Sequence, residues 1–396
     1  VASGYQALYS NTTGANNVAS GYQALYSNTT GANNVASGYQ ALYSNTTGAN
    51  NVVSGYQALF SNTSGGSNAA FGTQALALNI DGGQNTASGY GALRSNTNGN
   101  KNSASGYQAL YSNTTGSGNT ASGYQALYGN TTGSYNIVFG YQALYSNTTQ
   151  SGNIAVGDSA LYSNASGTKN MAFGTATLYA NTNGINNTAS GYHALRNNTT
   201  GGSNAGSGYF ALFSNTTGTE NAGYGTASLY NNLTGSNNTG IGYYADVSAG
   251  NLTNATAIGS SALVNASNKI RLGNTRVTVI EGQVAFSNSS DRRLKKDITN
   301  TKYGLQTILK LAPVDYQLIS NGLSQVGFIA QDLKPIVPEA VTGIEGDLEK
   351  GETLGVTYTT LIPVLTKAIQ EQQALIEAQD KVIQQLQKDM LILKQK

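Results

Sequence analysis

The sequence predicts a mainly β protein: a repetitive parallel β-solenoid (β-roll) rod with 17-residue coils, followed by a small α/β domain and a C-terminal coiled-coil helix. Three observations predict this fold. Glycine recurs at every seventeenth position over two thirds of the chain, charge gathers in the last third, and a heptad pattern of apolar residues ends the sequence. With 49 Gly, 26 Tyr and 10% charged residues among 396, the composition favours a repetitive segment over an average globular domain.

Composition also excludes several kinds of site. The chain has no cysteine, so it has neither disulfides nor thiolate metal sites nor a cysteine nucleophile. A single histidine, His193, excludes a Ser-His triad and a multi-histidine metal site, and we expect no metal and no cofactor. A net charge of +2, with one basic cluster at 292–296, disfavours nucleic-acid binding. The sequence has no run of 18 or more apolar residues, so we expect no membrane-spanning segment. No signal peptide is visible.

Residues 1–264 form the repeat. Its unit, GYQALYSNTTGANNVAS, is rich in Gly, Asn and Thr, which favour turns over helices, so we interpret each unit as one coil of a solenoid. Val18–Leu25 is the predicted strand, and Ser27–Gly31 is the predicted turn. The repeat glycines are Gly4, Gly21, Gly38, Gly55, Gly72, Gly89, Gly106, Gly123, Gly140, Gly157, Gly174, Gly191, Gly208, Gly225, Gly242 and Gly259.

Two further sets of residues that recur every 17 positions predict which side chains line the interior of the rod. Asparagine stands at Asn17 and at every seventeenth position through Asn238, which predicts an amide ladder between coils roughly 4.8 Å apart. Ala24 and Leu25, with their equivalents, predict a thin inward stripe. Because one such coil would bury little, we expect a second face with Ala19, Ala36 and Ala87 to pack against other copies of the chain.

The rod surface leaves three functional interpretations open. Tyrosine columns, such as the one through Tyr5 and Tyr22, are typical of sugar stacking, although a wide turn would also carry them. Paired threonines, such as Thr29-Thr30, are typical of an ice-binding array. Sequons at Asn11, Asn28, Asn45 and Asn113 are glycosylation candidates, yet the turn demands the same residues.

A polysaccharide-cleaving activity of the rod is excluded by its acids. Such chemistry needs two carboxylates in one cleft. The acids of the sixteen coils are Asp81, Asp158, Glu220 and Asp246, and they fall in four different columns on distant coils.

Residues 265–289 predict a β-rich neck. Short alternating apolar runs at 269–273, 277–280 and 282–286 read as strands. The chain has 38 charged residues (20 + 18), of which 8 lie in 1–264, so the other 30 lie in 265–396. This change in charge marks a domain boundary.

The repeat and the C-terminal region each resemble a known family. The repeat order N-x-A-x-G-x-x-A-L is similar to the head repeats of trimeric autotransporter adhesins, which build left-handed parallel β-rolls from three chains. The segments SDRRLKKD (290–297), LAPVDYQL (311–318), QVGFIAQDLKPIVPEAV (325–341) and LGVTYTTLIPVLTKAIQEQ (354–372) resemble the self-cleaving intramolecular chaperone domain of endosialidase-type phage tailspikes and fibres. This second resemblance spans 290–396.

The chaperone resemblance implies a trimerising domain that cuts its own chain. It makes Ser290 the nucleophile, Lys295 the base and Ser289-Ser290 the scissile bond, so the chain would be a single-turnover serine autoendopeptidase. A serine hydroxyl needs such a base, and neighbouring cations favour loss of the lysine proton. Taken alone, RRLKKD is more typical of a solvated charge run, and the three downstream motifs favour the catalytic interpretation. Asp291 receives no catalytic role.

Within the chaperone domain, the sequence predicts a short helix at 303–311, strands at 314–318 and 325–330 around the Asn321-Gly322 turn, and a broken helical segment at 331–340. We place the chaperone core at 290–358 and its coiled-coil helix at 359–396. The a positions of the heptads are Ile362, Ile369, Ile376, Ile383 and Met390, and the d positions are Leu365, Gln372, Gln379, Leu386 and Leu393. Ile at a with Leu at d favours dimers; the expectation of a homotrimer comes from the resemblance.

These observations together favour a phage tail fibre or a related adhesive surface fibre. We expect its partners to be two copies of itself and a host-surface glycan or protein receptor, and its location to be the virion or the extracellular surface. The alternatives are a trimeric bacterial adhesin, which the Gln- and Lys-rich terminal helix disfavours, and an ice- or glycan-binding solenoid with the same chaperone.

Overall fold

The computed structural model describes residues 1–283, 289–319, 322–346 and 353–394. The chain divides into two compact units, Val1–Asn274 and Thr275–Lys396, each of which is described by itself. Within the described residues, no helix combines the length and the apolar character that crossing a bilayer requires.

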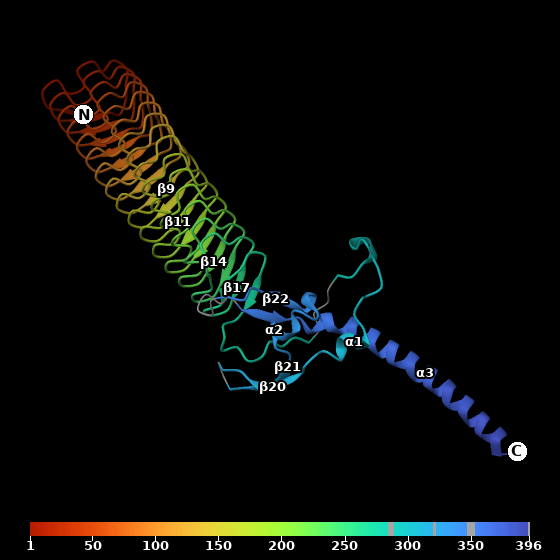
Figure 1. Cartoon of the computed structure of the whole chain (residues 1–396). Coiled ribbons are helices and arrows are strands. Elements are labelled where there is room, and N and C mark those ends of the chain that lie inside the picture. The colour runs from red at the N-terminus through yellow and green to blue at the C-terminus, as the bar shows by residue number, and fades with distance from the viewer. Residues whose placement is uncertain (284–288, 320–321, 347–352, 395–396) are drawn as a thin grey trace. The chain divides into compact units, whose positions relative to one another are not determined.

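The first unit is a β-solenoid in which each coil stacks on the next (Figure 1). Short parallel strands pair exactly one repeat apart, as in Val18↔Val35, and the last pairing, Thr256↔Ile270, is three positions shorter. The strands of this sheet are β1 (Ala2–Ser3), β2 (Val18–Ser20), β3 (Val35–Ser37), β4 (Val52–Ser54), β5 (Ala69–Phe71), β6 (Thr86–Ser88), β7 (Ser103–Ser105), β8 (Thr120–Ser122), β9 (Ile137–Phe139), β10 (Ile154–Val156), β11 (Met171–Phe173), β12 (Thr188–Ser190), β13 (Ala205–Ser207), β14 (Ala222–Tyr224), β15 (Thr239–Ile241), β17 (Thr256–Ile258) and β19 (Ile270–Leu272). The predicted parallel β-solenoid is therefore confirmed.

The strand of each coil is shorter than the sequence predicts. It ends at Ser20, where the prediction extended it to Leu25, because the chain turns at Gly21 with φ 137°. Gln23 and Leu25 then adopt left-handed φ values of 54° and 52°. Gly21 has no substitute, since a Cβ there would collide with the carbonyl of Gly38 in the next coil.

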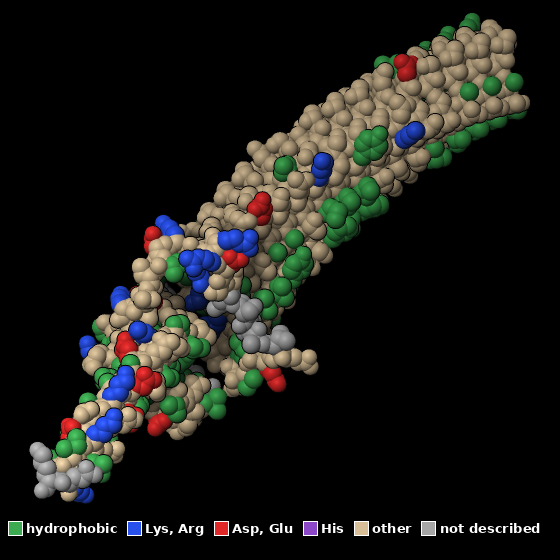
Figure 2. All heavy atoms as spheres, turned by 90° about the vertical axis from the view of Figure 1, so that its right-hand side faces the viewer, with side chains coloured by type: hydrophobic (Ala, Val, Ile, Leu, Met, Phe, Trp, Pro, Cys, Tyr) green, Lys and Arg blue, Asp and Glu red, His purple; other side chains and the backbone are tan. Residues whose placement is uncertain are grey.

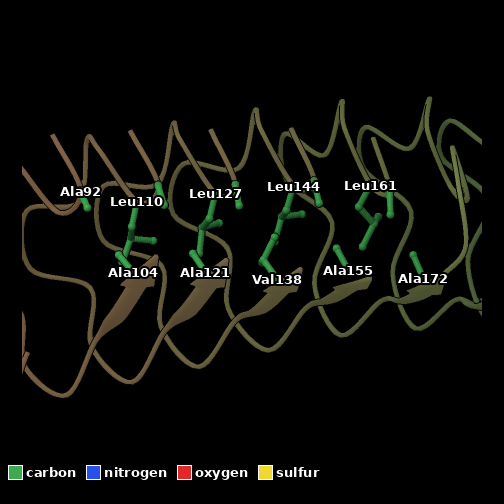
Figure 3. Close-up of a cluster of buried hydrophobic side chains, with 14 of the residues drawn as sticks. Ala92, Ala104, Leu110, Ala121, Leu127, Val138, Leu144, Ala155, Leu161 and Ala172 are labelled. Atoms are coloured by element: carbon green, nitrogen blue, oxygen red, sulfur yellow. The ribbon is translucent and has the colours of Figure 1, made fainter. Parts of the chain in front are cut away.

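Each coil of a single chain closes around its own core. The left-handed turn points Leu25 and Ala24 inward, where both are fully buried against the strand alanines. In Figure 3, Leu110 and Leu127 point toward Ala104 and Ala121 on the strands. The expectation that Ala19, Ala36 and Ala87 pack against other copies was wrong, because these side chains are 0–1% exposed inside their own chain.

Two asparagine ladders line the interior. In the predicted ladder, the Asn34 backbone N–H donates to Asn17 Oδ1 (2.9 Å), and Asn34 Nδ2 donates to the carbonyl of Gly48 (2.8 Å). The second ladder was not predicted. In it, Asn45 Nδ2 donates to Asn28 Oδ1 (2.7 Å). Both columns are buried, and together they satisfy the polar groups of the turns.

The end of the solenoid departs from the repeat. A two-stranded parallel sheet of β16 (Asp246–Val247) and β18 (Leu263–Val264) forms where earlier coils carry the left-handed turn. Of the three short strands predicted near here, residues 270–272 form β19, residues 277–280 form no strand, and residues 284–286 of the third lie outside the described residues.

The second unit is a small α/β domain that ends in a long helix. Antiparallel β20 pairs with β21, and β22 pairs with β23; Asn321 of the predicted turn lies outside the described residues. Leu333, Val337, Ala340 and Leu361 form a compact buried core. The elements of the unit are the 3-10 helix η1 (Arg292–Leu294), α1 (Leu305–Ile308), β20 (Val314–Gln317), β21 (Ser324–Gly327), α2 (Ala330–Leu333), the 3-10 helix η2 (Pro338–Ala340), β22 (Val341–Gly343), β23 (Leu354–Val356), the 3-10 helix η3 (Tyr358–Thr360) and α3 (Leu361–Lys394).

The heptad positions of α3 are exposed in the single chain. Ile369, Ile376 and Ile383 at the a positions are 64%, 50% and 51% exposed, and Leu386 at a d position is 57% exposed. The helix therefore carries an apolar stripe that its own chain does not cover.

Candidate functional site

A single turn brings Ser290 and Lys295 together. The 3-10 helix η1 spans Arg292–Leu294 and reverses the chain, and the Lys295 backbone N–H closes it on the carbonyl of Arg292 (3.1 Å). Lys295 then leaves in an extended conformation (φ −125°, ψ 143°), which directs its side chain back along the turn. Lys295 Nζ lies 2.6 Å from Ser290 Oγ and donates to it.

Asp291 holds this turn in shape. Its carboxylate caps η1 by accepting from the Arg293 backbone N–H (2.8 Å), and it forms an ion pair with the Arg293 guanidinium (Nη2 to Oδ2, 2.7 Å). The hydrogen bonds from Arg293 lower the pKa of the Asp291 carboxyl, so the acceptor stays ionised. Sequence reasoning gave Asp291 no role in catalysis; an N-cap aspartate before a short turn was the available signal.

The arrangement can move a proton between serine and lysine. A hydroxyl and an amine at hydrogen-bond distance can exchange donor and acceptor roles without moving their heavy atoms, so a neutral Lys295 could accept the Ser290 proton. Both residues and Ser289 are exposed to solvent in the single chain.

The residues after the turn are anchored to the rest of the unit. Tyr303 Oη donates to Glu339 (2.6 Å), and Lys302 forms an ion pair with the same carboxylate (3.7 Å). Glu371 on α3 accepts from the Leu305 backbone N–H (2.8 Å) at the start of α1. The long helix is thereby fixed to the segment that follows the Ser290/Lys295 pair.

The tyrosine columns on the rod stack on themselves. Rings of Tyr22 and Tyr39 lie 5.1 Å apart with planes 7° from parallel, and those of Tyr26 and Tyr43 are also 5.1 Å apart at 5°. Each interior ring therefore has both faces next to another ring, and no sugar fits between them. Stacking of a sugar on a tyrosine face is restricted to places where the columns are interrupted.

The sequons inside the rod are not accessible once it has folded. Asn28, Asn45 and Asn113 are fully buried, and their Nδ2 groups donate within the second ladder and to carbonyls of the turn. Among the described residues, no cluster of three or more His, Asp or Glu side chains could hold a metal ion.

The fold and the site together define a class of protein: a solenoid rod followed in the chain by a small domain, which begins with a serine-lysine pair and ends in a long helix. Residues 290–342 match the family Peptidase_S74, described as the chaperone of endosialidase. The chain thus carries an endosialidase-type chaperone domain near its C-terminus, after the β-solenoid. The match begins at Ser290 and ends in β22, so it is narrower than the resemblance over 290–396. No curated protein matches the chain.

Proposed function

We propose that this chain is a homotrimeric fibre protein of the phage tail fibre type, whose C-terminal domain assembles the trimer and then releases itself by cleavage at Ser289-Ser290. The observation that carries the proposal is the 2.6 Å contact between Lys295 Nζ and Ser290 Oγ at the first residue of the chaperone match. We expect such a fibre to act in receptor binding or adhesion, on the virion or at a cell surface.

The proposed cleavage uses the serine next to the bond that breaks. Lys295 Nζ takes the proton of Ser290 Oγ, and the oxygen attacks the carbonyl carbon of Ser289. Lys295 returns the proton to the leaving backbone nitrogen of Ser290, so the amide becomes an ester between Ser289 and the Ser290 side chain. Water hydrolyses this ester, which leaves a carboxylate on Ser289 and restores the Ser290 hydroxyl.

Assembly would come before the cut in this mechanism. The pair is exposed in the single chain, and contact with neighbouring chains would both bury Lys295 and fix the attacking geometry. The exposed heptads of α3 supply a surface for that assembly. Once the domain has left, the rod cannot unfold by reversing its folding path, so its stability becomes kinetic.

Intact-mass analysis and denaturing electrophoresis of the wild type, Ser290→Ala and Lys295→Ala test the proposal. We expect the wild type to give two fragments, 1–289 and 290–396, and both variants to stay uncut near the full-length mass of 40.9 kDa while still assembling. Ser290→Ala lacks the nucleophile, and Lys295→Ala leaves it unactivated. A wild type that stays uncut after assembly, or a Ser290→Ala chain that splits at this bond, would contradict the proposed protease.

A further inference from the structure

The outer surface of the rod's parallel sheet is exposed to solvent in the single chain. Because side chains alternate along a strand, Ala19 points inward while Val18 and Ser20 point outward, and Tyr22, just after the turn at Gly21, is exposed as well. Val18 and Tyr22 are 41% and 42% exposed. We define the outer sheet face by three positions in each coil: the third residue before the repeat glycine, the residue directly before it and the residue directly after it. Figure 2 shows hydrophobic side chains gathered along one edge of the rod.

Each coil keeps a bulky apolar side chain on the outer sheet face by one of two routes. In nine coils, serine precedes the repeat glycine and tyrosine follows it, as in Ser105 and Tyr107. Two more coils are bulky on both sides of the glycine. In the remaining five coils a small or polar residue follows the glycine and the bulk moves to the preceding position, as in these pairs: Phe71 with Thr73, Val156 with Asp158, Phe173 with Thr175, Tyr224 with Thr226, and Ile258 with Ser260.

This exchange indicates that the outer sheet face itself requires a bulky apolar side chain in each coil. A turn that needed tyrosine for its own geometry would gain nothing from a phenylalanine two positions earlier. The exchange also interrupts the hydroxyl pattern of the face, so a flat periodic ligand would not meet the same groups on successive coils.

The outer sheet face also lacks charge. Its three positions in sixteen coils make 48 sites, of which one, Asp158, is charged; this share is close to that of the rest of the rod, where seven of the other 216 residues of 1–264 are charged. A face with so little charge is compatible with the centre of a protein interface, because such centres are depleted of charged residues.

The size of the face fits another protein surface. The face is sixteen coils long, at roughly 4.8 Å per coil, and about 14 Å wide, which is the length of about four extended residues. Its area is therefore on the order of 1,000 Å². A stable complex buries about 800 Å² per partner, so the face is large enough for one. The helix α3 exposes a heptad stripe that a second copy of the same helix would cover.

We propose that the outer sheet face is the surface along which the rods of neighbouring copies of this chain pack against one another. The inference rests on the proposed assembly and adds the face of the rod that is buried in it. It leaves the turns outside the contact, where charged residues such as Lys101, Lys169 and Glu220 remain in water.

The absence of cysteine makes the proposal directly testable in the full-length chain. Ser105→Cys places one thiol on the outer sheet face, and Thr115→Cys places one on an exposed turn of the neighbouring segment; both positions are solvent-exposed in the single chain. The rate of maleimide modification is measured in the assembled protein and again in denaturant. A short bismaleimide then reports whether two thiols of different copies lie close together.

In the assembled protein, we expect the Ser105→Cys variant to react at least about tenfold more slowly than the Thr115→Cys variant. The two variants should react equally fast in denaturant, and Ser105→Cys alone should give covalent oligomers with the bismaleimide. Equal native rates without cross-linking would overturn the proposal. A protected Ser105→Cys variant that never cross-links to another copy would overturn it as well, since a different molecule would then cover the face.

Cleavage at Ser289-Ser290 and burial of the outer sheet face are measured independently, so either proposal can fail without the other. An uncut chain whose Ser105→Cys thiol is protected and cross-linked supports the face and contradicts the cleavage. A cleaved chain whose Ser105→Cys thiol reacts freely supports the cleavage and contradicts the face.

Discussion

At the scale of single residues, Asp291 is the side chain that we expect to set the geometry of the Ser290/Lys295 pair. It touches neither the bond that would break nor the two reacting groups, so it is a positioning residue. Its carboxylate holds the turn through the Arg293 backbone and guanidinium. Without these bonds, the turn between Ser290 and Lys295 would be held only by the backbone hydrogen bonds of Leu294 and Lys295.

Asp291→Ala should therefore slow cleavage by about 10- to 100-fold without changing the fraction of assembled chain, because a misplaced base loses much of its effect. Asp291→Asn keeps an oxygen that can accept from the Arg293 N–H and should retain more activity than the alanine variant. The measurement is the rate of fragment appearance on denaturing gels, with assembly followed by native electrophoresis. Equal rates in wild type and Asp291→Ala would remove Asp291 from the site.

A second residue of interest, Asp246, lies inside the rod. It occupies the position that leucine holds in the preceding coils, and it is 5% exposed. Burial raises the pKa of its carboxyl to about 6, although hydrogen bonds from the backbone N–H groups of Val247 (2.8 Å) and Asn231 (3.2 Å) act in the opposite direction.

Because the folded pKa lies above the usual aspartate value of 3.8, folding favours the protonated carboxyl, and the rod loses stability as the pH rises from about 4 to about 6. A shift of about two pKa units corresponds to roughly 3 kcal/mol per chain. We expect Asp246→Asn to unfold more slowly and at a higher temperature than wild type at pH 7, and to differ little from it at pH 4. Glu220→Gln, at an exposed turn, is the control and should change neither value.

At the scale of elements, each asparagine ladder joins successive coils over most of the rod. Asn119 makes the contacts of one interior rung: its Nδ2 donates to the Gly133 carbonyl (2.8 Å), and its Oδ1 accepts from the Asn136 backbone N–H (3.0 Å). Removing the side chain leaves the buried Asn136 N–H without this acceptor, whereas the Gly133 carbonyl keeps the hydrogen bond that it accepts from Asn130 Nδ2 (2.9 Å).

Asn119→Ala should cost roughly 1–3 kcal/mol per chain, and the loss should multiply in an oligomer. Thr115→Ala, which truncates an exposed turn residue of the same coil region, should cost far less. Thermal unfolding followed by circular dichroism compares the two. Similar melting temperatures for both variants would mean that the ladder contributes little.

The repeat period and the first ladder could be predicted because the Gly and Asn columns recur without insertion. The left-handed turn could not. Gln23 and Leu25 disfavour positive φ as isolated residues, and stacking compensates, since Gln23 N–H bonds to the Tyr5 carbonyl (2.8 Å) and Leu25 N–H to the Ala41 carbonyl (3.1 Å). Because that turn aims Leu25 at Ala19, the prediction that Ala19 faces other copies failed with it.

Several chaperone elements were predicted more closely than the coil, although the pairing of β22 with β23 was not predicted. Prolines and the Gly322 turn fixed the boundaries of β20, β21, α2 and η2 within a few residues, as local rules usually do. The contact of Ser290 with Lys295 was expected from the resemblance, whereas the cap that shapes it depends on Arg293 rotating back to Asp291. Such a short-range side-chain arrangement leaves no periodic trace in the sequence.

At the scale of the whole molecule, chemistry is separated along the chain. Residues 1–264 hold eight of its 38 charged residues, and the described part of the rod is held by hydrogen bonds and a thin apolar core. The C-terminal region holds the Ser290/Lys295 pair and the heptad helix. A division of this kind suits a fibre in which one region assembles the chains and another persists afterwards.

The hydrogen bonds between coils have a mechanical consequence, because they run parallel to the solenoid axis. A force that pulls the two ends of the rod apart loads the bonds of one coil at a time, so we expect coils to peel off one after another. Each released coil adds one repeat of extended chain at about 3.4 Å per residue, less the roughly 5 Å that the coil occupied, so the chain should lengthen in steps of about 50 Å. Single-molecule pulling would measure a ladder of equal steps at modest, similar forces. One large rupture of the whole rod would instead show that the coils are held together by contacts across the axis.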